Sequence, residues 1–413
     1  MKQLVTEIKV GLDFGNGIQP VGRLARRSTT IYFEYDSEFI DSGLEISPFR
    51  LPLRPGVIEL LQRPFEGLSG VFSDSLPDGW GRLLFDRMMR TQGILLSDIS
   101  PLDRLAYVGL HGMGALVYEP DNSPSDNNEL INLDHLATQT EQVLEGNSEE
   151  VIAELLALNG SSAGARPKAL IGIDKTREKI SHGAKRLGDD FEHWLVKFPN
   201  SQDGNDAGAI EYVYALMAKE AGILMPEVHL FSSKKGNGYF AVKRFDRDRS
   251  KRLHMHTVAG LTHSDFRLPS LDYEDLLNLT GALTKDIREV EKIYRLAVFN
   301  VMAHNQDDHA KNFSFLMNEI GEWKLSPAYD LTFSSGAGGE QSTMVMGVGK
   351  NPTTKHLEKL GSELGLSKEL IKNSIDQTRE AVGLWSKLSK EYGVSQMNAN
   401  IIGKAIDLHS TRT

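Results

Sequence analysis

The side chains best suited to chemistry lie together in one stretch, residues 303–315, whose sequence is AHNQDDHAKNFSF. The stretch holds two carboxylates, two imidazoles, a lysine and two asparagines, and it follows an apolar run at 296–302 that is typical of a buried helix end. The polar part has no amphipathic period, so we expect a loop held by a packed scaffold. Such residues can serve as a base or hold a metal ion, or they can simply form a hydrogen-bonded loop that caps the helix.

The spacing of two of these residues matches a catalytic arrangement. Asp307 and Asn312 are five positions apart. The Asp and Asn of the kinase catalytic loop H-R-D-x-x-x-x-N have the same spacing, and there the Asp orients the hydroxyl nucleophile and the Asn holds a metal ion. Asp308 lacks this spacing, so Asp307 is the candidate base. A further carboxylate, Asp330, follows two short strand-like segments, and a metal-binding Asp after a β-hairpin is the second half of this arrangement.

The residue types also indicate which metal would suit the loop. Oxygen ligands from Asn312 and Asp330 favour Mg²⁺, which keeps several of its waters and is shared with nucleotide phosphates. His304 and His309 beside the acids could suggest zinc instead. Two histidines five positions apart, without a third ligand nearby, are however a weak zinc pattern.

Two other segments could contribute to a phosphate site. Lys197 lies in a strand-like segment at 194–198, where it could reach nucleotide phosphates, although an edge lysine facing solvent fits the pattern equally. Glu211, in the helix that follows, could hold this lysine or could simply be an acid near a helix N-terminus. The small-residue loop at 159–168 can bring backbone N–H groups close to phosphate, but it has neither a Walker A motif nor a complete G-x-G-x-x-G.

Two serines lie inside this small-residue loop. Ser161 and Ser162 could be turn formers, or they could accept phosphate themselves and so change the charge and shape of the loop. Lys168 adds a positive charge at the far end of the loop.

The composition bounds the class of protein. A length of 413 residues indicates roughly two to three domains. The net charge of −10 argues against a molecule built as an electrostatic nucleic-acid binder. The absence of cysteine excludes disulfides, thiolate catalysis and thiolate metal sites. There is neither an apolar N-terminal signal segment nor a run of about 20 apolar residues, so we expect a cytoplasmic protein without a membrane span.

Strand-like segments dominate the first part of the chain, and helical segments dominate the last part. The predicted strands are 5–14, 21–24, 31–35, 115–119, 169–173, 194–198, 228–231 and 239–245. The predicted helices are 77–89, 101–108, 129–145, 149–158, 207–222, 272–281, 285–304, 354–360, 367–391 and 396–408. Strands first and helices after indicate an α+β body with two lobes rather than alternating βαβ units.

A series of short motifs runs along nearly the whole chain. They are QPVGRL at 19–24, IYFEY at 31–35, SGLEISP at 42–48, SLPDGWG at 75–81, GARPK at 164–168, KFP at 197–199, KRFDR at 243–247, DDHAKNFS at 307–314 and PAYDL at 327–331. In this order they resemble the HipA family of bacterial serine/threonine kinase toxins, the toxin halves of toxin–antitoxin pairs. The pattern D-x-H-x-K-N-F-S is the most specific of them.

The resemblance implies a two-lobed, protein-kinase-like fold. Residues 1–125 would be an N-terminal HipA-type subdomain of antiparallel β-structure with helices. Residues 126–246 would form the remainder of the N-terminal lobe, with the Gly-rich loop, the lysine strand and the hinge. Residues 247–413 would form an all-helical C-terminal lobe that carries the catalytic loop and the metal-binding Asp.

The resemblance also implies a role for each site residue. Asp307 would be the catalytic base, Asn312 and Asp330 would hold Mg²⁺, and Lys197 would engage the ATP phosphates. The rest of the ATP site would be the Gly-rich loop, the hinge and part of the catalytic loop: Ala163, Gly164, Ala165, Arg166, Pro167, Lys168, Lys243, Arg244, Phe245, His309, Ala310, Lys311 and Tyr329. Lys243 stands where the family often has an acid. In the family, a serine at the start of the Gly-rich loop is autophosphorylated, which ejects the loop and silences the enzyme, and this position falls on Ser161 or the adjacent Ser162.

The function implied is that of an ATP- and Mg²⁺-dependent protein serine/threonine kinase. It would phosphorylate a cellular protein, such as a tRNA synthetase, and would pair with a helix-turn-helix, HipB-like antitoxin that joins it to operator DNA. One alternative is a catalytically weak corepressor that acts only by complexing the DNA-binding antitoxin, although the intact candidate site argues against decay. A small-molecule or lipid kinase would share the same chemistry.

Overall fold

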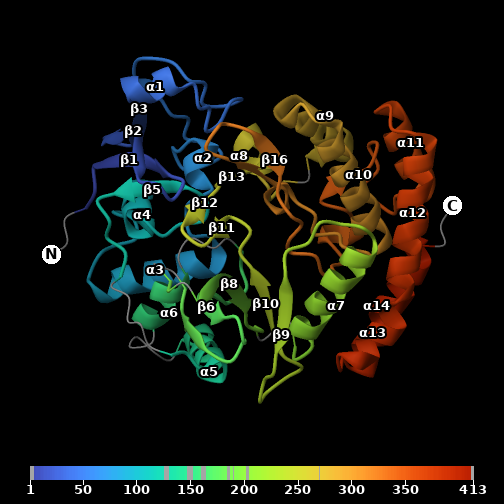
Figure 1. Cartoon of the computed structure of the whole chain (residues 1–413). Helices are drawn as coiled ribbons and strands as arrows, with labels where there is room; N and C mark the ends of the chain where they lie inside the picture. Colours follow the sequence, from blue (N-terminus) through green and yellow to red (C-terminus); the bar gives the residue numbers. More distant parts are fainter. Residues whose placement is uncertain are drawn as a thin grey trace.

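The computed structural model describes residues 4–124, 130–146, 152–159, 164–183, 187–188, 190–200, 204–268 and 270–410. Figure 1 shows three parts: an antiparallel sheet with short helices near the N-terminus, a second sheet beside it, and a layer of long helices on the opposite side. This mixed, mainly antiparallel architecture confirms the predicted α+β class. No helix among the described residues is long and apolar enough to cross a membrane.

The first sheet has the strand order β4-β3-β2-β1-β5 and is antiparallel throughout. Alternate residues of β3, including Phe33, point into its core because side chains alternate between the faces of a strand. Met317 of β15 (Ser314–Met317) and Trp323 of β16 (Trp323–Leu325), far along the chain, pack into this same core. The elements of this part are β1 (Glu7–Asp13), β2 (Ile18–Arg27), β3 (Thr30–Tyr35), β4 (Ile58–Glu59), β5 (Leu116–Glu119), α1 (Ser37–Ser42), α2 (Gly70–Ser73), α3 (Gly79–Thr91) and α4 (Pro101–Val108).

The second sheet has the order β7-β6-β8-β10-β9 and carries the predicted lysine strand at its centre. Helix α7 packs against β9 and β10, while α6 packs against β6 and α3. Trp80, Trp194 and Val196 are fully buried in the core beneath this sheet. Its elements are β6 (Lys168–Asp174), β7 (Ile180–His182), β8 (Phe191–Lys197), β9 (Val228–Phe231), β10 (Tyr239–Lys243), α5 (Leu133–Leu144), α6 (Ile152–Asn159) and α7 (Ala207–Glu220).

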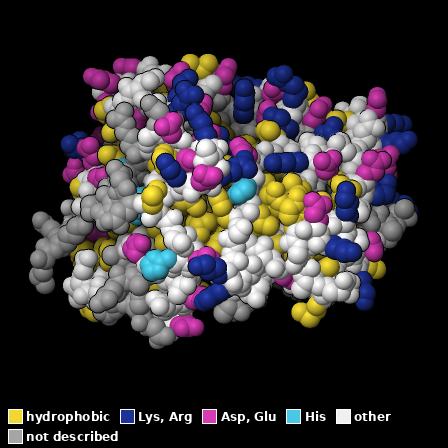
Figure 2. Space-filling model, turned by 60° about the horizontal axis from the view of Figure 1, so that its bottom comes forward, with side chains coloured by type: hydrophobic (Ala, Val, Ile, Leu, Met, Phe, Trp, Pro, Cys, Tyr) yellow, Lys and Arg dark blue, Asp and Glu magenta, His cyan; other side chains and the backbone are white. Residues whose placement is uncertain are grey.

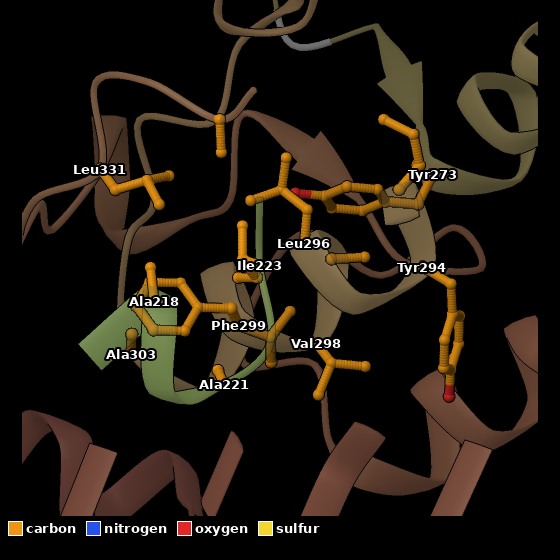
Figure 3. Packing of buried hydrophobic residues seen from close by; sticks show 14 of the residues in the cluster. Ala218, Ala221, Ile223, Tyr273, Tyr294, Leu296, Val298, Phe299, Ala303 and Leu331 are labelled. Carbon is orange, nitrogen blue, oxygen red and sulfur yellow. The ribbon is translucent and has the colours of Figure 1, made fainter. Parts of the chain in front are cut away.

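The long helices surround the largest hydrophobic core, part of which Figure 3 shows. In this view Phe299 of α10 and Ala303, just after it, lie close to Ala218 of α7 and Ala221, which follows that helix. The apolar run at 296–302 therefore forms the buried end of α10, as the sequence predicted. The helices are α8 (Val258–Thr262), α9 (Tyr273–Thr284), α10 (Ile287–Met302), α11 (Thr354–Glu363), α12 (Lys368–Gly383), α13 (Trp385–Glu391) and α14 (Gln396–Ser410), with short 3₁₀ turns at η1 (Ala310–Asn312) and η2 (Ala337–Gly339).

The C-terminal part is not purely helical, which corrects the all-helical lobe expected from the sequence. A three-stranded antiparallel sheet, β13-β15-β16, lies within it, and β14 (Leu271–Asp272) pairs in parallel with β17 (Thr343–Met344). The hairpin β15–β16 was predicted, but β13 (His254–Thr257) was not, because its sequence HMHT has one apolar residue and no apolar alternation. A two-stranded ribbon, β11 (Arg247–Asp248) and β12 (Lys251–Arg252), precedes it.

A buried histidine joins β13 to the first part of the chain. His256 Nδ1 lies 2.6 Å from Asp74 Oδ2, and His256 Nε2 lies 2.9 Å from Ser47 Oγ. This Ser–His–Asp arrangement resembles a hydrolytic triad in its contacts, but Ser47 and His256 are both completely buried. It therefore holds two parts of the chain together rather than facing a substrate.

A buried charge network makes a second connection between these parts. Asp246 accepts hydrogen bonds from Arg244 (2.7 and 3.0 Å) and from Arg247 (2.9 Å), and its own side chain is completely buried. The carbonyl oxygens of Gly112 and Gly114 accept hydrogen bonds from Arg247, both at 2.6 Å. Burial alone would raise the pKa of Asp246, but the charges of Arg244 and Arg247 hold it well below its usual range. The segment at 112–114 thus supplies backbone acceptors to a buried arginine.

We expect Asp246→Ala to destabilise the protein by about 3–5 kcal/mol, because it leaves buried guanidinium groups without their anionic partner. Urea unfolding followed by circular dichroism measures this change. Asp376→Ala is the matched control, since Asp376 pairs with Arg379 at the surface, and we expect a change within about 0.5 kcal/mol. Equal unfolding midpoints for the two variants would contradict the prediction.

Candidate kinase site

Lys197 is the residue on which the candidate site converges. Its Nζ lies 2.5 Å from Glu211 Oε1 of α7 and 2.5 Å from Asp330 Oδ1. Only 11% of the lysine side chain is exposed, so it is no solvent-facing edge residue. Burial alone would lower the pKa of Lys197, but Asp330 and Glu211 hold it above its ordinary value. Glu211 is almost fully buried and is therefore the partner of the lysine, rather than merely an acid near a helix N-terminus.

Asp330 occupies an unusual backbone conformation. Its φ of 59° lies in the left-handed region, which aspartate tolerates better than most non-glycine residues. The charge of Lys197, followed by that of Lys168, holds the pKa of Asp330 well below its ordinary value. The residue is therefore a carboxylate at neutral pH, held in a fixed orientation at the point where the predicted metal-binding Asp was expected.

Further cations surround this pair of carboxylates. Lys168 lies directly opposite Lys197 in the register of β6 and β8. Burial, together with the neighbouring charge of Lys197, lowers the pKa of Lys168 to about 8. Arg166 Nη1 lies 3.6 Å from Glu211 Oε2. Three cationic side chains thus stand around two carboxylates, an arrangement that favours a bound polyanion.

The Gly-rich loop approaches these cations closely. Gly164 has a φ of +109°, which favours glycine over residues with a side chain, and a Cβ at this position would meet the end of the flexible Lys168 side chain. Ala165 and Pro167 continue the loop into β6. Ser161, Ser162 and Ala163 lie outside the described residues.

The predicted catalytic loop, residues 303–315, begins directly after α10. Asp307 is exposed, and its backbone oxygen accepts a 2.7 Å hydrogen bond from Asn312 Nδ2, which closes the loop between the two predicted residues. Loss of hydration raises the pKa of Asp307, and the nearby negative charge of Asp330 raises it further, against the opposing charges of His309 and Arg166. Asp307 therefore lies within electrostatic range of Asp330.

The neighbouring Asp308 is a structural residue. It is buried, and its carboxylate accepts hydrogen bonds from Tyr273 Oη (2.7 Å), Thr343 N (3.1 Å) and Gln341 Nε2 (3.2 Å). Burial raises its pKa to about 7, although these donors oppose the shift. Asp308 thus anchors the catalytic loop to α9 and to the segment at 341–343, while Asp307 faces solvent.

The oxygen donors present fit a magnesium ion better than zinc. Because the Asn312 amide nitrogen is used within the loop, its oxygen is the atom that could contact a cation beside the Asp330 carboxylate. The rings of His304 and His309 instead pack near Phe333 and Phe266, each at 5.3 Å between centroids. Within the described part of the chain, no group of three or more His, Asp or Glu side chains forms a metal site.

The three hinge residues do not all face the site. Lys243 Nζ pairs with Glu192 at 2.6 Å, and the Arg244 side chain belongs to the buried Asp246 network. Only Phe245 turns toward the catalytic segment, where its ring lies 5.7 Å from that of Tyr329. The Tyr329 hydroxyl in turn donates a 2.7 Å hydrogen bond to the Lys311 carbonyl oxygen.

Two residues that sequence reasoning did not assign to the site contact the catalytic loop. Asp78 Oδ2 lies 2.7 Å from Lys311 Nζ, and the Phe266 ring centroid lies 4.4 Å from the same ammonium. Asp78 stands in the SLPDGWG motif, whose position in the family pattern was the available signal. Phe266 lies in an irregular segment that no motif marked.

A strand lysine paired with a helix glutamate and with a carboxylate after a hairpin, in an α+β chain, is the arrangement expected of a kinase-like protein. Residues 160–385 match the family described as HipA-like C-terminal domain, and residues 16–119 match the HipA N-terminal domain. The chain therefore belongs to the HipA family.

Individual relatives agree with this assignment. The chain is 26% identical over 237 residues to the protein named "Putative kinase Y4dM" of Sinorhizobium fredii. This match covers 52% of this chain and 56% of that protein. It is also 26% identical over 174 residues to "Putative kinase Y4mE" of the same organism. This match covers 36% of this chain and 40% of that protein. The matches thus span about half the length of these relatives. The HipA chain of Shewanella oneidensis, solved with HipB and operator DNA, has the same fold, with a TM-score of 0.67, 17% identity, and coverage of 98% of this chain and 96% of that one.

The buried carboxyl of Asp308 predicts a pH dependence of stability. Its pKa rises from 3.8 in the unfolded chain to about 7 in the folded one, so the folded protein binds this proton more tightly. The contribution of the Asp308 carboxyl to the free energy of unfolding is therefore complete below pH 4. It is lost as pH rises toward 7, by at most about 1.4 kcal/mol per pH unit. Asp308→Asn stays neutral and lacks this dependence.

Urea unfolding of wild type and Asp308→Asn across this pH range checks the prediction. We expect wild type to lose stability relative to the variant between pH 4 and 7, and the difference to level off above pH 7. Parallel stability curves for the two proteins would show that Asp308 does not titrate in this way.

Proposed function

We propose that this chain is an ATP- and Mg²⁺-dependent protein serine/threonine kinase that acts as the toxin of a bacterial toxin–antitoxin pair. The observation that carries the proposal is the Lys197 ammonium, held by both Glu211 and Asp330 beside the exposed Asp307. Phosphoryl transfer requires positioning and charge stabilisation rather than covalent chemistry from the protein. These residues provide both requirements.

Each side chain has a distinct part in the proposed reaction. Asp307 accepts a hydrogen bond from the acceptor hydroxyl, orients it and receives its proton, which the raised pKa favours. Lys197, Lys168 and Arg166 bind and orient the nucleotide phosphates as they gain charge. Asn312 and Asp330 would hold Mg²⁺, which when bound neutralises phosphate charge. Phe245 and Tyr329 offer an aromatic surface on the hinge side.

The regulatory and partner assignments belong to the same proposal. We assign autophosphorylation to Ser161 or Ser162, which lie three and two positions before Gly164 in the sequence. The solved HipA of Shewanella oneidensis is in complex with HipB and operator DNA, which supports a helix-turn-helix antitoxin as the partner of this chain. On the face shown in Figure 2, basic and acidic side chains are interspersed around exposed hydrophobic ones. Together with the acidic net charge, this supports DNA contact mainly through the antitoxin. A cellular protein, such as a tRNA synthetase, is the proposed substrate.

Asp307→Asn should reduce phosphoryl transfer by about 10²–10⁴-fold, because the amide can neither accept the hydroxyl proton nor orient the hydroxyl as strongly. The measurement is incorporation of labelled phosphate from ATP and Mg²⁺, with phosphoserine located by mass spectrometry. Asp376→Asn, an exposed acid on α12, serves as the control and should retain full activity. An unchanged rate for Asp307→Asn would remove this residue from the role of base. An inactive wild type that still binds a DNA-binding antitoxin would favour the corepressor alternative.

Lys197→Ala should weaken ATP binding by roughly 10- to 100-fold, because it removes a charge-assisted contact to phosphate. Isothermal titration calorimetry measures the affinity, and a thermal melt confirms that the variant is folded although Glu211 has lost its lysine partner. Lys235→Ala removes an exposed lysine that pairs with Glu141 and should leave ATP affinity unchanged. Equal ATP affinity for wild type and Lys197→Ala would refute the phosphate-binding role.

A further inference from the structure

The first turn of α3 lies between the two loops of the candidate site. Helix α3 begins at Gly79, and the residues at its start, Asp78 to Trp80, come from the part of the chain before the second sheet. Asp78 contacts the catalytic loop, whereas Gly79 and Trp80 contact the Gly-rich loop. These two loops are far apart in sequence, so this turn is a physical bridge between them.

The contact to the catalytic loop is an ion pair. Asp78 Oδ2 lies 2.7 Å from Lys311 Nζ, with 24% and 15% of the two side chains exposed. Burial alone would raise the pKa of Asp78, but the charge and hydrogen bond of Lys311 hold it below its ordinary value, so Asp78 is a carboxylate at neutral pH. Lys311 lies between the candidate base Asp307 and the candidate metal ligand Asn312, nearer the latter. Fixing its ammonium therefore restrains the segment that carries both.

The contact to the Gly-rich loop is made by the backbone. Trp80 N donates a 3.1 Å hydrogen bond to the Gly164 carbonyl oxygen. A Cβ at Gly79 would lie only 2.5 Å from that oxygen and 2.6 Å from Ala165 Cα, so any side chain would push the loop away. The Trp80 ring is buried in the core beneath the second sheet, which fixes the turn in place.

Helix capping does not account for the second carboxylate oxygen of Asp78. Its Oδ1 accepts a 2.8 Å hydrogen bond from Gly79 N, the adjacent residue, which satisfies one N–H at the helix start. Its Oδ2 is directed instead to Lys311, which is 233 residues away along the chain. One carboxylate therefore serves both the helix start and the catalytic loop.

We propose that Asp78 is a positioning residue for phosphoryl transfer, acting through Lys311, and that the Asp78–Trp80 turn sets the spacing between the Gly-rich loop and the catalytic loop. The inference rests on the proposed kinase function. The part of the chain before the second sheet then has a direct effect on turnover, because displacement of α3 would release both loops together.

The two halves of the turn should have different kinetic effects. Asp78→Asn keeps the shape of the side chain but loses the ion pair, so we expect kcat to fall about tenfold, with the KM for ATP changed by less than about threefold. Gly79→Ala displaces the loop over the phosphates, so we expect it mainly to raise the KM for ATP. Asp78→Glu retains the charge and should recover part of the lost kcat.

A double-mutant cycle with Lys311→Gln separates positioning from a general loss of stability. If Asp78 acts through Lys311, the double variant Asp78→Asn/Lys311→Gln should have the same kcat as Lys311→Gln alone. Asp286→Asn is the matched control, since Asp286 also caps a helix and pairs with a base, Arg288, at 2.7 Å, yet lies at the far end of α10. Additive losses, or a wild-type kcat in Asp78→Asn, would overturn the inference.

Hydrogen exchange of the same proteins tests the positioning without requiring activity. Amides of residues 307–314 should exchange faster in Asp78→Asn than in wild type, and should be unchanged in Asp286→Asn. Identical exchange in Asp78→Asn and wild type would show that the pair does not hold the loop. A wild type that binds no ATP and transfers no phosphate, yet shows the faster exchange in Asp78→Asn, would reject the proposed function while leaving the contact intact.

Discussion

The structure depends on one buried ammonium shared by two carboxylates. Lys197 lies at the end of a central strand, Glu211 on the helix behind the sheet, and Asp330 in the segment after the β15–β16 hairpin. Removing such charges from water is unfavourable unless they are paired with good geometry. Pairing therefore stabilises the buried Lys197 and Glu211 above all, and it connects the second sheet to the segment that carries Asp330. The left-handed backbone of Asp330 is tolerated because this pairing determines its conformation.

Packing and polar contacts elsewhere support that placement. The end of α10 is held against α7 by apolar side chains and by the Tyr214 hydroxyl, which donates a 2.6 Å hydrogen bond to the Ala303 carbonyl oxygen. Asp308 then holds the start of the catalytic loop from inside, so Asp307 is presented to solvent on a rigid support. Preorganisation of this kind suits phosphoryl transfer, in which the protein contributes mainly position and charge.

Elements with strong local signals could be predicted from the sequence, whereas long-range polar contacts could not. Helix α4 begins and ends where its Ser100 cap, Pro101 and Gly109 indicate, and the apolar run of α10 was recognised by its composition. The predicted helix at 367–391 is instead divided into α12 and α13 at Leu384, after Gly383, which weakens a helix by about 1 kcal/mol.

In the candidate site, the Asp307–Asn312 spacing and the lysine strand were visible in the sequence, but the partner of Lys311 was not, because it lies 233 residues away. The direction of the Arg244 side chain could not be predicted either, because the hydrophobic alternation at the end of a strand does not reveal that a buried anion lies nearby.

The core of the first sheet is completed by residues that are synthesised much later than its strands. Met317 and Trp323, from the β15–β16 hairpin, complete the hydrophobic interior of strands that belong to the first 119 residues. During synthesis from the N-terminus, that interior stays unfinished until the ribosome has released residues well beyond 323, and its apolar surface is exposed to solvent meanwhile. The N-terminal portion expressed alone would therefore lack part of its own core.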